Sequence, residues 1–485
     1  MPENRYYPYP EPHTHRIKKG PLRRPIPDHL HGHLLDLLSD QQPPPNRRPI
    51  DGANIRSTEG ITLPNFDSIS KQAFIARDQL LAQRSAACAD MPLRFWNQQA
   101  HFTSPASGSP EKAITGLKAN AKILKRFGIS VDELAQYTGA DAAILDDLIN
   151  NPDNHTPLVM VDAEDAVALT EDSSDKAREG AKRVFSQAQW GSTLAFFRPS
   201  GLGLDTCIGD LLEVLPAVAE GHSAEDYPID GIIWPKPEHP EEITWVCNLL
   251  SQVEEQLGLK PNQIKFQFLI ESGYALNQLR ELAQAAVPRL TGLIWGIADY
   301  SADANLPVIQ NDHPVCDWAR YQLVNLAGAL NVPAIDSMTL NYPTPVHRGA
   351  DLTEQQQAEN KQKILRALKD VFDEANHGIH LGMAGKWVGH PAQLLMVMAA
   401  YRNAIPQSQI DSDIEEIQAY NTAVASGAGA TMIGEGKKEY MADRATDRHL
   451  RARLRRATAW GALSSEKAVE LEVITEQERM ELGGQ

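Results

Sequence analysis

The stretch "LIWGIADYSADANLP", residues 293–307, begins as a buried strand and then places Asp299 and Asp303 just beyond its end. Parallel strands that are covered on both faces have short apolar runs of this kind. A carboxylate at the end of such a run is costly to bury unless it is paired or bound to something. Similar runs elsewhere in the chain, and the residues that follow them, decide the fold and the site.

From about residue 91 onward, short apolar runs alternate with longer stretches of helical periodicity, which is typical of parallel strands joined by crossover helices. The candidate strands are residues 100–104, 158–162, 194–198, 230–234, 265–271, 292–297, 333–336 and 379–383. Eight such units predict an α/β fold, a (β/α)8 TIM barrel. A doubly wound open sheet is the alternative, although no Gly-rich nucleotide fingerprint follows any of the runs.

Composition and periodicity divide the chain into three predicted parts. Residues 1–90 begin with a proline-rich stretch that cannot build a packed core, and we interpret them as an N-terminal arm with a helical extension. Residues 91–400 are the predicted TIM-barrel catalytic domain. Residues 401–485 have mainly helical patterns and are too long for a last barrel helix, so we expect a C-terminal lid that could cover the barrel mouth.

Charge and composition exclude several classes of protein. The net charge of −17 would repel a phosphate backbone, so we do not expect a nucleic-acid partner. No apolar run approaches the roughly 18 residues that a membrane span needs, and no apolar segment follows the N-terminal basic residues as in a secretory signal. The four cysteines are widely scattered and lack a CxxC spacing, which argues against disulfides and zinc. We therefore expect a cytoplasmic protein without a membrane role.

In a TIM barrel the active site lies where the carboxyl ends of the strands meet. Charged residues follow five consecutive predicted strands, and a ring of this kind is more informative than any single member. In strand order, these residues are Asp162, Glu164 and Asp165, then Arg198, Lys236, Glu271 and Asp299.

Glu271 and Asp299 follow adjacent strands, which would bring two carboxylates near one point. An oxygen-only pair with room for water and substrate suits Mg²⁺ or Mn²⁺ rather than zinc. Taken singly, each acid is equally well explained as a salt-bridged or solvated strand end. Arg198 has the fork geometry to bind a carboxylate or a developing enolate oxygen, unless it only pairs with the acids of the second strand. Together these groups suit the making or breaking of a carbon–carbon bond beside a carbonyl.

Several stretches, in order along residues 100–400, resemble the superfamily of citrate lyase β subunits, malyl-CoA lyases and HpcH/HpaI aldolases, and more distantly the malate synthases. They are "VDAEDAV" at 161–167, "FFRPSG" at 196–201, "IIWPKPE" at 232–238, "FLIES" at 268–272, "GIADYSAD" at 296–303 and "GMAGKWVGHPAQL" at 382–394. The resemblance implies a barrel fold.

Position by position, the resemblance also implies roles for individual residues. It makes Glu271 and Asp299 the metal ligands and places Arg198 on the oxygen of a keto acid or enolate. It makes Asp162 and Glu164 acids that shape the same site. Lys236 lies in the matching turn and is a substrate-binding candidate, with a solvated loop residue as the alternative reading.

The C-terminal stretch "YMADRATDRHLRARL", residues 440–454, resembles the M-E-D-x-A-T stretch of malate synthases. In those enzymes the aspartate removes a proton from the methyl group of acetyl-CoA, and Asp443 stands at this position. Ala442 departs from the pattern. The alternative for Asp443 is a surface carboxylate paired with Arg444 or Arg448. As a general base, Asp443 would need a lid that carries it over the barrel mouth.

The leading hypothesis is a Mg²⁺-dependent (or Mn²⁺-dependent) lyase or synthase that acts on a CoA thioester and a 2-oxo acid such as glyoxylate. A CoA-independent aldolase of 4-hydroxy-2-oxo acids is a second reading, although Asp165 replaces the histidine base of that branch. A non-catalytic barrel that senses a metabolite is the third. By resemblance, we expect a homo-oligomer whose partners are the acyl-CoA and the oxo acid.

Overall fold

Eight parallel strands close into a barrel in the computed structural model, which describes residues 67–86, 91–165, 170–434 and 439–483. The strands are β1 (Ala100–Pro105), β2 (Leu158–Asp162), β3 (Leu194–Arg198), β4 (Gly231–Trp234), β5 (Lys265–Ile270), β6 (Leu290–Trp295), β7 (Ala334–Asp336) and β8 (Gly385–Val388). They pair in sequence order, and β8 closes the barrel by pairing with β1. The predicted α/β TIM-barrel fold is confirmed.

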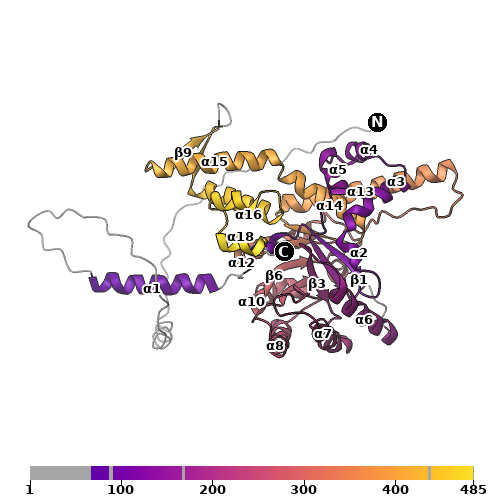
Figure 1. Cartoon of the computed structure of the whole chain (residues 1–485), viewed down its shortest axis with the longest axis horizontal. Coiled ribbons are helices and arrows are strands. Elements are labelled where there is room, and N and C mark those ends of the chain that lie inside the picture. The colour runs from indigo at the N-terminus through magenta and orange to yellow at the C-terminus, as the bar shows by residue number, and fades with distance from the viewer. Residues whose placement is uncertain (1–66, 87–90, 166–169, 435–438, 484–485) are drawn as a thin grey trace, which may run out of the picture. The chain divides into compact units, whose positions relative to one another are not determined.

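Helices connect consecutive strands, as parallel pairing requires (Figure 1). Between β1 and β2 lie α2 (Glu111–Ile114), the short 3₁₀ helix η3 (Gly116–Lys118), α3 (Ala119–Arg126), α4 (Val131–Thr138) and α5 (Ala142–Asn150). The later connections contain α6 (Glu171–Gln187), α7 (Thr206–Ala217), α8 (Pro240–Leu257), α9 (Gly273–Asn277), α10 (Leu279–Ala286), α11 (Ile297–Asp303), α12 (Pro314–Leu330) and α13 (Glu354–Leu381). The helix α14 (Pro391–Ala404) follows β8 and completes the eighth unit.

The predicted position of the eighth strand was wrong. Residues 379–381, which we expected to begin that strand, are the last residues of α13, and β8 begins only at Gly385. Gly382 ends the helix in the left-handed conformation with a φ of 96°, a common way to end a helix. The apolar residues before Gly382 face the core as part of a long amphipathic helix, which a short window cannot distinguish from a strand.

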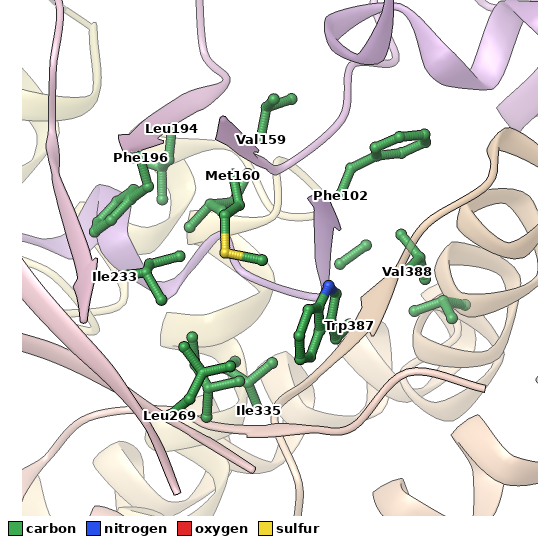
Figure 2. Packing of buried hydrophobic residues seen from close by; sticks show 14 of the residues in the cluster. Phe102, Val159, Met160, Leu194, Phe196, Ile233, Leu269, Ile335, Trp387 and Val388 are labelled. Carbon is green, nitrogen blue, oxygen red and sulfur yellow. The ribbon is translucent and has the colours of Figure 1, made fainter. Parts of the chain in front are cut away.

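Side chains alternate between the two faces of each strand, so residues two apart share one face. Figure 2 shows Met160, Ile233, Leu269, Ile335 and Trp387 directed toward one another from different strands. All are buried, and Ile233, Leu269 and Ile335 are fully inaccessible. The barrel interior is therefore packed with side chains, and open space for a ligand has to lie at one end of it.

A second, smaller core lies in the C-terminal part of the chain. This part contains α15 (Gln407–Ala425), the hairpin of β9 (Ala430–Ile433) and β10 (Tyr440–Asp443), α16 (Arg444–Ala459), α17 (Ser465–Glu470) and α18 (Glu476–Gly483). Figure 1 shows these elements in orange and yellow. The expectation of a mainly helical segment therefore missed a hairpin, whose two strands are only four residues long.

The C-terminal helices are fastened near the amino ends of the barrel strands. Leu93, in the 3₁₀ helix η2 (Leu93–Trp96) that precedes β1, belongs to the same core as residues of α16 and α17. The indole of Trp460 donates a hydrogen bond to the carbonyl of Trp96. Arg94 of η2 pairs with Asp230, which immediately precedes β4. Within one chain, these helices attach opposite the carboxyl ends of the strands, so their role as a lid stays a prediction.

The N-terminal region is described only in part. The helix α1 (Asp67–Ala86) exposes apolar side chains such as Phe74 and Leu80. The predicted proline-rich arm lies outside the described residues, and the three domain boundaries stay predictions. Among the helices of the described ranges, none has the length and apolar content needed to cross a bilayer.

A small polar cluster is buried between β1, β5 and β6. The amide nitrogen of Gln98 donates to the carbonyl of Thr291 at 3.0 Å, which leaves its Oε1 as an acceptor. Nε2 of His101 and the amide nitrogen of Gln267 each lie 2.9 Å from this Oε1 and donate to it. Burial lowers the pKa of His101 to about 3, so the imidazole stays neutral in the folded protein.

The buried imidazole predicts a loss of stability in acid. In the unfolded chain, histidine takes up a proton below its ordinary pKa of about 6.5. Because the folded-state pKa of His101 is lower, at about 3, stability is lost as the pH falls from 6.5 toward 3. The loss from this residue is about 1.4 kcal/mol per pH unit. We expect His101→Gln, which keeps a donor for Gln98, to flatten the dependence of the urea midpoint on pH below 6.5. Parallel curves for the two proteins would contradict this.

Candidate active site at the carboxyl ends of the strands

A buried ion pair between β2 and β3 forms the floor of the site. Asp162 and Arg198 are direct partners in the strand register, so their side chains emerge side by side. Nε of Arg198 lies 2.6 Å from Oδ1 of Asp162, and Nη2 lies 2.7 Å from Oδ2. The guanidinium also lies over the ring of Trp387, with 5.4 Å to the centroid. These contacts hold the arginine in one orientation.

Two further acids from the loop after β2 surround the same guanidinium. Nη1 of Arg198 lies 3.3 Å from both Glu164 and Asp165. Burial raises the pKa of Glu164 to about 6, against the opposing effect of Arg198. For Asp165 burial also raises the pKa, but Arg198 and Lys236 outweigh it, so the pKa is lowered overall. At neutral pH, a larger fraction of Asp165 than of Glu164 is therefore ionised.

Lys236, in the turn after β4, reaches across to these acids. Its Nζ lies 3.1 Å from Glu164, 3.0 Å from Asp165 and 3.3 Å from Asp299. Burial lowers the pKa of Lys236, but the hydrogen bond with Asp165 and the charges of the acids raise it overall, so the ammonium stays charged. The structure therefore brings Lys236 into the predicted site, on the side of the acids.

Glu271 follows β5 and is buried, with 6% of its surface exposed. Burial raises its pKa to about 8, although Arg198 and Lys236 favour the ionised form. Its Oε2 is inaccessible and accepts no hydrogen bond within the described part of the chain. An unpaired, buried carboxylate oxygen is costly, so this atom is a candidate ligand for a cation.

Gly296 makes room for the Glu271 side chain. Ile270 and Trp295 are partners in the register of β5 and β6, which sets the next residues of the two strands beside each other. A Cβ atom at position 296 would lie 2.2 Å from Oε1 of Glu271. A glycine is therefore required here by close approach and not by an unusual backbone angle, since its φ is −113°.

Three carboxylates meet beside this position. Asp165, Glu271 and Asp299 each offer an oxygen, and these oxygens lie within 4.8 Å of one another. Asp299 lies in the first turn of α11 and not on the strand itself. An all-oxygen set with an orphaned buried oxygen and two exposed members fits a divalent ion such as Mg²⁺ or Mn²⁺, with positions left for water or substrate. The predicted pair of Glu271 and Asp299 thus lies together, with Asp165 as a third member.

A cavity of about 370 Å³ opens above these groups. Its charged side contains five of the residues discussed above. The other part of its lining is largely apolar and comes from β1, the start of α11, the loop after β7, and β8. The lining residues of that part include Pro105, Ile297, Ala298, Met338, Leu340, Tyr342 and Trp387. A small polar molecule bound at the carboxylates would therefore have an apolar wall beside it.

Asp303, the second acid of the stretch that follows β6, has a structural role. Its Oδ2 accepts a hydrogen bond of 2.6 Å from the backbone nitrogen of Gly273. This bond ties the end of α11 to the start of α9, and thus joins the loops that carry Asp299 and Glu271. Asp303 supports the site without belonging to the carboxylate cluster.

Asp443, the predicted general base, lies elsewhere. It is not among the residues that line the cavity. It precedes α16 and accepts hydrogen bonds from the backbone nitrogens of Ala445 and Thr446, which lower its pKa. Neither Arg444 nor Arg448 forms an ion pair with it in the described part of the chain. The structure therefore does not bring Asp443 to the cavity of its own chain.

Sequence reasoning gave Asp165, Gly296 and Trp387 no role in the site. Asp165 was named in the ring of charged residues but not as a metal ligand, although its place three residues after the end of β2 was a usable signal. Gly296 owes its importance to the register of β5 and β6, which a sequence does not contain. Trp387 lies on β8, whose position was predicted wrongly.

Gly296→Ala tests the close approach to Glu271. The added methyl group would push the carboxylate away from the cluster, since its carbon would lie 2.2 Å from Oε1. We expect roughly 10–100-fold weaker binding of Mn²⁺, measured by calorimetry, in a protein with an unchanged circular dichroism spectrum. Gly203→Ala is the matched control, because a Cβ there meets nothing within 4 Å. Equal Mn²⁺ affinity in both variants would show that Glu271 binds no ion.

Comparison with known proteins gives relatives of low identity. A protein named L-malyl-CoA/beta-methylmalyl-CoA lyase from Haloarcula marismortui is 22% identical over 266 residues, which cover 55% of this chain and 68% of the relative. A protein of the same name from Rhodobacter capsulatus is 25% identical over 292 residues, which cover 57% of this chain and 80% of the relative.

Two solved structures are similar in outline. A citrate lyase from Burkholderia xenovorans has a TM-score of 0.49 and 18% identity, and the match covers 80% of this chain and 98% of the other. A malate synthase from Haloferax volcanii has a TM-score of 0.42 and 17% identity over 80% of this chain and 97% of the other.

The family model described as "Domain of unknown function (DUF6986)" matches residues 223–482, more than half of the chain. This segment includes β5, which precedes Glu271, and nearly all of the C-terminal part, with Asp443. The chain therefore belongs to the DUF6986 family, within the superfamily of lyases and synthases that contains the citrate lyase β subunits, the malyl-CoA lyases and the HpcH/HpaI aldolases.

Proposed function

We propose that this protein is a divalent-metal-dependent carbon–carbon lyase or synthase that acts on a CoA thioester and a 2-oxo acid such as glyoxylate. The observation that carries the proposal is the orphaned, buried Oε2 of Glu271, beside Asp165 and Asp299 and in the same cavity as Arg198. The names of the relatives support the choice of substrates.

Each group of the cavity has a role in this reaction. When bound at Asp165, Glu271 and Asp299, Mg²⁺ or Mn²⁺ would chelate the oxo acid and offset negative charge on its oxygens. Arg198 has five N–H donors, of which three are used in hydrogen bonds with Asp162 and Asp165. Nη1 also lies 3.3 Å from Glu164, so the second N–H of Nη2 is the donor that we assign to a substrate oxygen.

Asp162 and Glu164 act on the substrate through Arg198. The bidentate pair with Asp162 fixes the plane of the guanidinium, so its free N–H groups have one direction. Glu164 adds a partly protonated acid beside it, because burial raises its pKa to about 6. Such fixed donors can stabilise the enolate oxygen without reorganising as charge develops.

In the condensing direction, a base removes a proton from the carbon beside the thioester carbonyl. The resulting enolate attacks the carbonyl carbon of the oxo acid, a carbon–carbon bond forms, and the former carbonyl oxygen takes up a proton to become a hydroxyl group. Cleavage runs through the same steps in reverse. Asp443 is our candidate for the base, and its lowered pKa keeps it ionised.

Because Asp443 is absent from the cavity of its own chain, we propose that a neighbouring copy supplies it. The hairpin next to Asp443 supports this, since Met432 and Met441 expose 58% and 59% of their surfaces to solvent. Exposed apolar side chains beside a polar group are typical of a surface that another chain covers. The expected homo-oligomer would then be needed for activity.

Glu271→Gln tests the reaction and its metal site together. Purified protein, Mg²⁺, glyoxylate and acetyl-CoA or propionyl-CoA should give a malyl-CoA-type product that mass spectrometry detects. We expect Glu271→Gln to lower kcat/KM by about 10²–10³, because it removes a charged ligand and the charge it holds in place. Glu255→Gln, on the exposed side of α8, is the control and should retain full activity.

Two outcomes would redirect this proposal. If the protein cleaves 4-hydroxy-2-oxo acids without any CoA, the CoA-independent aldolase is the better description. If neither reaction occurs with any acyl-CoA or oxo acid tested, yet Mn²⁺ still binds, the barrel is a metabolite-binding protein rather than a lyase.

A mixing experiment tests whether Asp443 acts between chains. Asp443→Asn and Glu271→Gln should each be inactive alone, because each lacks one half of the site. Co-expressed in equal amounts, they should regain about a quarter of the wild-type rate, since random assembly pairs an intact cavity with an intact Asp443 in that share of sites. The activity of the co-purified protein gives the result directly. No gain on mixing, with mixed oligomers present, would place both residues in one chain's site or remove Asp443 from the reaction.

A further inference from the structure

Lys236 has an unusual backbone conformation that aims its side chain into the site. Its φ is 48°, in the left-handed region that side chains other than glycine rarely adopt. It stands between Pro235 and Pro237, and a residue before proline disfavours helical conformations even further. Strain of this kind persists only where the surrounding structure imposes it, and it gathers at functional sites.

The ammonium group of Lys236 holds three carboxylates at once. It lies 3.0–3.3 Å from Asp165, Glu164 and Asp299. Glu164 comes from the loop after β2 and Asp299 from α11, so the lysine bridges elements on opposite sides of its own strand. Its side chain is 40% exposed, which leaves it room to move toward the solvent.

Two of these three partners belong to the carboxylate cluster. Asp165 and Asp299, with Glu271, form the candidate site for a divalent ion. The ammonium therefore lies against the same carboxylates that would bind the ion. Both cations cannot use them fully at the same time, because they compete for the same oxygen lone pairs and repel each other.

We propose that Lys236 is an exchangeable counter-ion, which neutralises the metal-free carboxylates and moves away from Asp165 and Asp299 when a divalent cation binds. The inference rests on the proposed function only in assigning the metal site. Glu164 stays as the anchor of the lysine, since it is outside the carboxylate cluster. The released ammonium then faces the cavity mouth, where it can pair with the carboxylate of an incoming oxo acid.

This arrangement orders the events at the site. Without the ion, Lys236 is engaged by acids and has little attraction for an anionic substrate. With the ion in place, the same ammonium becomes available to that substrate. An oxo acid should therefore bind well only after the cation, and the lysine should lower the affinity for the cation while raising that for the acid.

Lys236→Met tests the competition, with Mn²⁺ alone as the probe and calorimetry as the measurement on the full-length protein. We expect Mn²⁺ to bind about tenfold tighter to the variant, because the competing charge is gone. The control is Lys182→Met, which removes a lysine paired with Glu179 and Glu213 on the surface, and which should leave Mn²⁺ affinity unchanged. Equal or weaker Mn²⁺ binding by Lys236→Met overturns the proposal.

A second measurement uses the wild-type protein and needs no variant to fold. Acetic anhydride modifies free amines, and peptide mapping by mass spectrometry gives the rate for each lysine. We expect the acetylation of Lys236 to rise several-fold on addition of Mn²⁺, with Lys182 unchanged. Unchanged or slower modification of Lys236 contradicts release.

The two experiments separate this inference from the proposed reaction. Tighter Mn²⁺ binding by Lys236→Met in a protein without lyase or synthase activity upholds the exchange and rejects the reaction. Activity on glyoxylate and acyl-CoA, with equal Mn²⁺ affinity in wild type and Lys236→Met, upholds the reaction and rejects the exchange. If both hold, Lys236→Met should also raise KM for the oxo acid more than it lowers kcat.

Discussion

A carboxylate buried without a partner at the end of β5 is the constraint on which the site depends. Removing Glu271 from water raises its pKa to about 8, and its Oε2 finds no hydrogen bond within the described residues. The register of β5 and β6 places the Glu271 side chain directly against Gly296. A side chain at position 296 would leave no room for it, since even a Cβ atom would lie 2.2 Å from Oε1 of Glu271. A buried carboxylate is stabilised when an opposite charge lies beside it. We therefore place a cation at Glu271.

Other buried charges of the barrel show the contrast. Arg289 and Glu254, near the amino ends of the strands, form two short hydrogen bonds of 2.6 and 2.7 Å and are satisfied within the chain. At the mouth, the carboxylates outnumber Arg198 and Lys236, so the cations of the chain do not balance them. An ion pair such as that of Arg289 and Glu254 fixes how two elements pack. A cluster with excess negative charge instead favours the binding of a cation. The same imbalance explains why Lys236 is drawn to three acids at once.

Much of the fold could be read from the sequence, because parallel strands and crossover helices leave distinct periodicities. The eighth strand was misplaced because Gly382, the end of a long helix, lies inside an apolar run. The ion pair of Arg198 with an acid of the second strand was one of two readings that the sequence left open, and the structure contains it with Asp162. By contrast, the role of Gly296 depends on the register of two strands. The contact of Lys236 with the acids depends on its positive φ. A local sequence pattern contains neither piece of information. The direction in which the C-terminal helices pack is decided by η2, more than 300 residues earlier in the chain.

That packing has a consequence for how a complete site would form. The oxygen cluster and Arg198 belong to the barrel mouth, whereas Asp443 belongs to a segment fastened near the opposite end of the strands. The segment cannot swing to its own mouth without giving up the core around Leu93 and the bond between Trp460 and Trp96. Under the proposed function, the barrel of one chain would bind metal and oxo acid by itself, and proton removal would wait for a second chain. A single chain would then bind the oxo acid, but the reaction would occur only in the assembled oligomer.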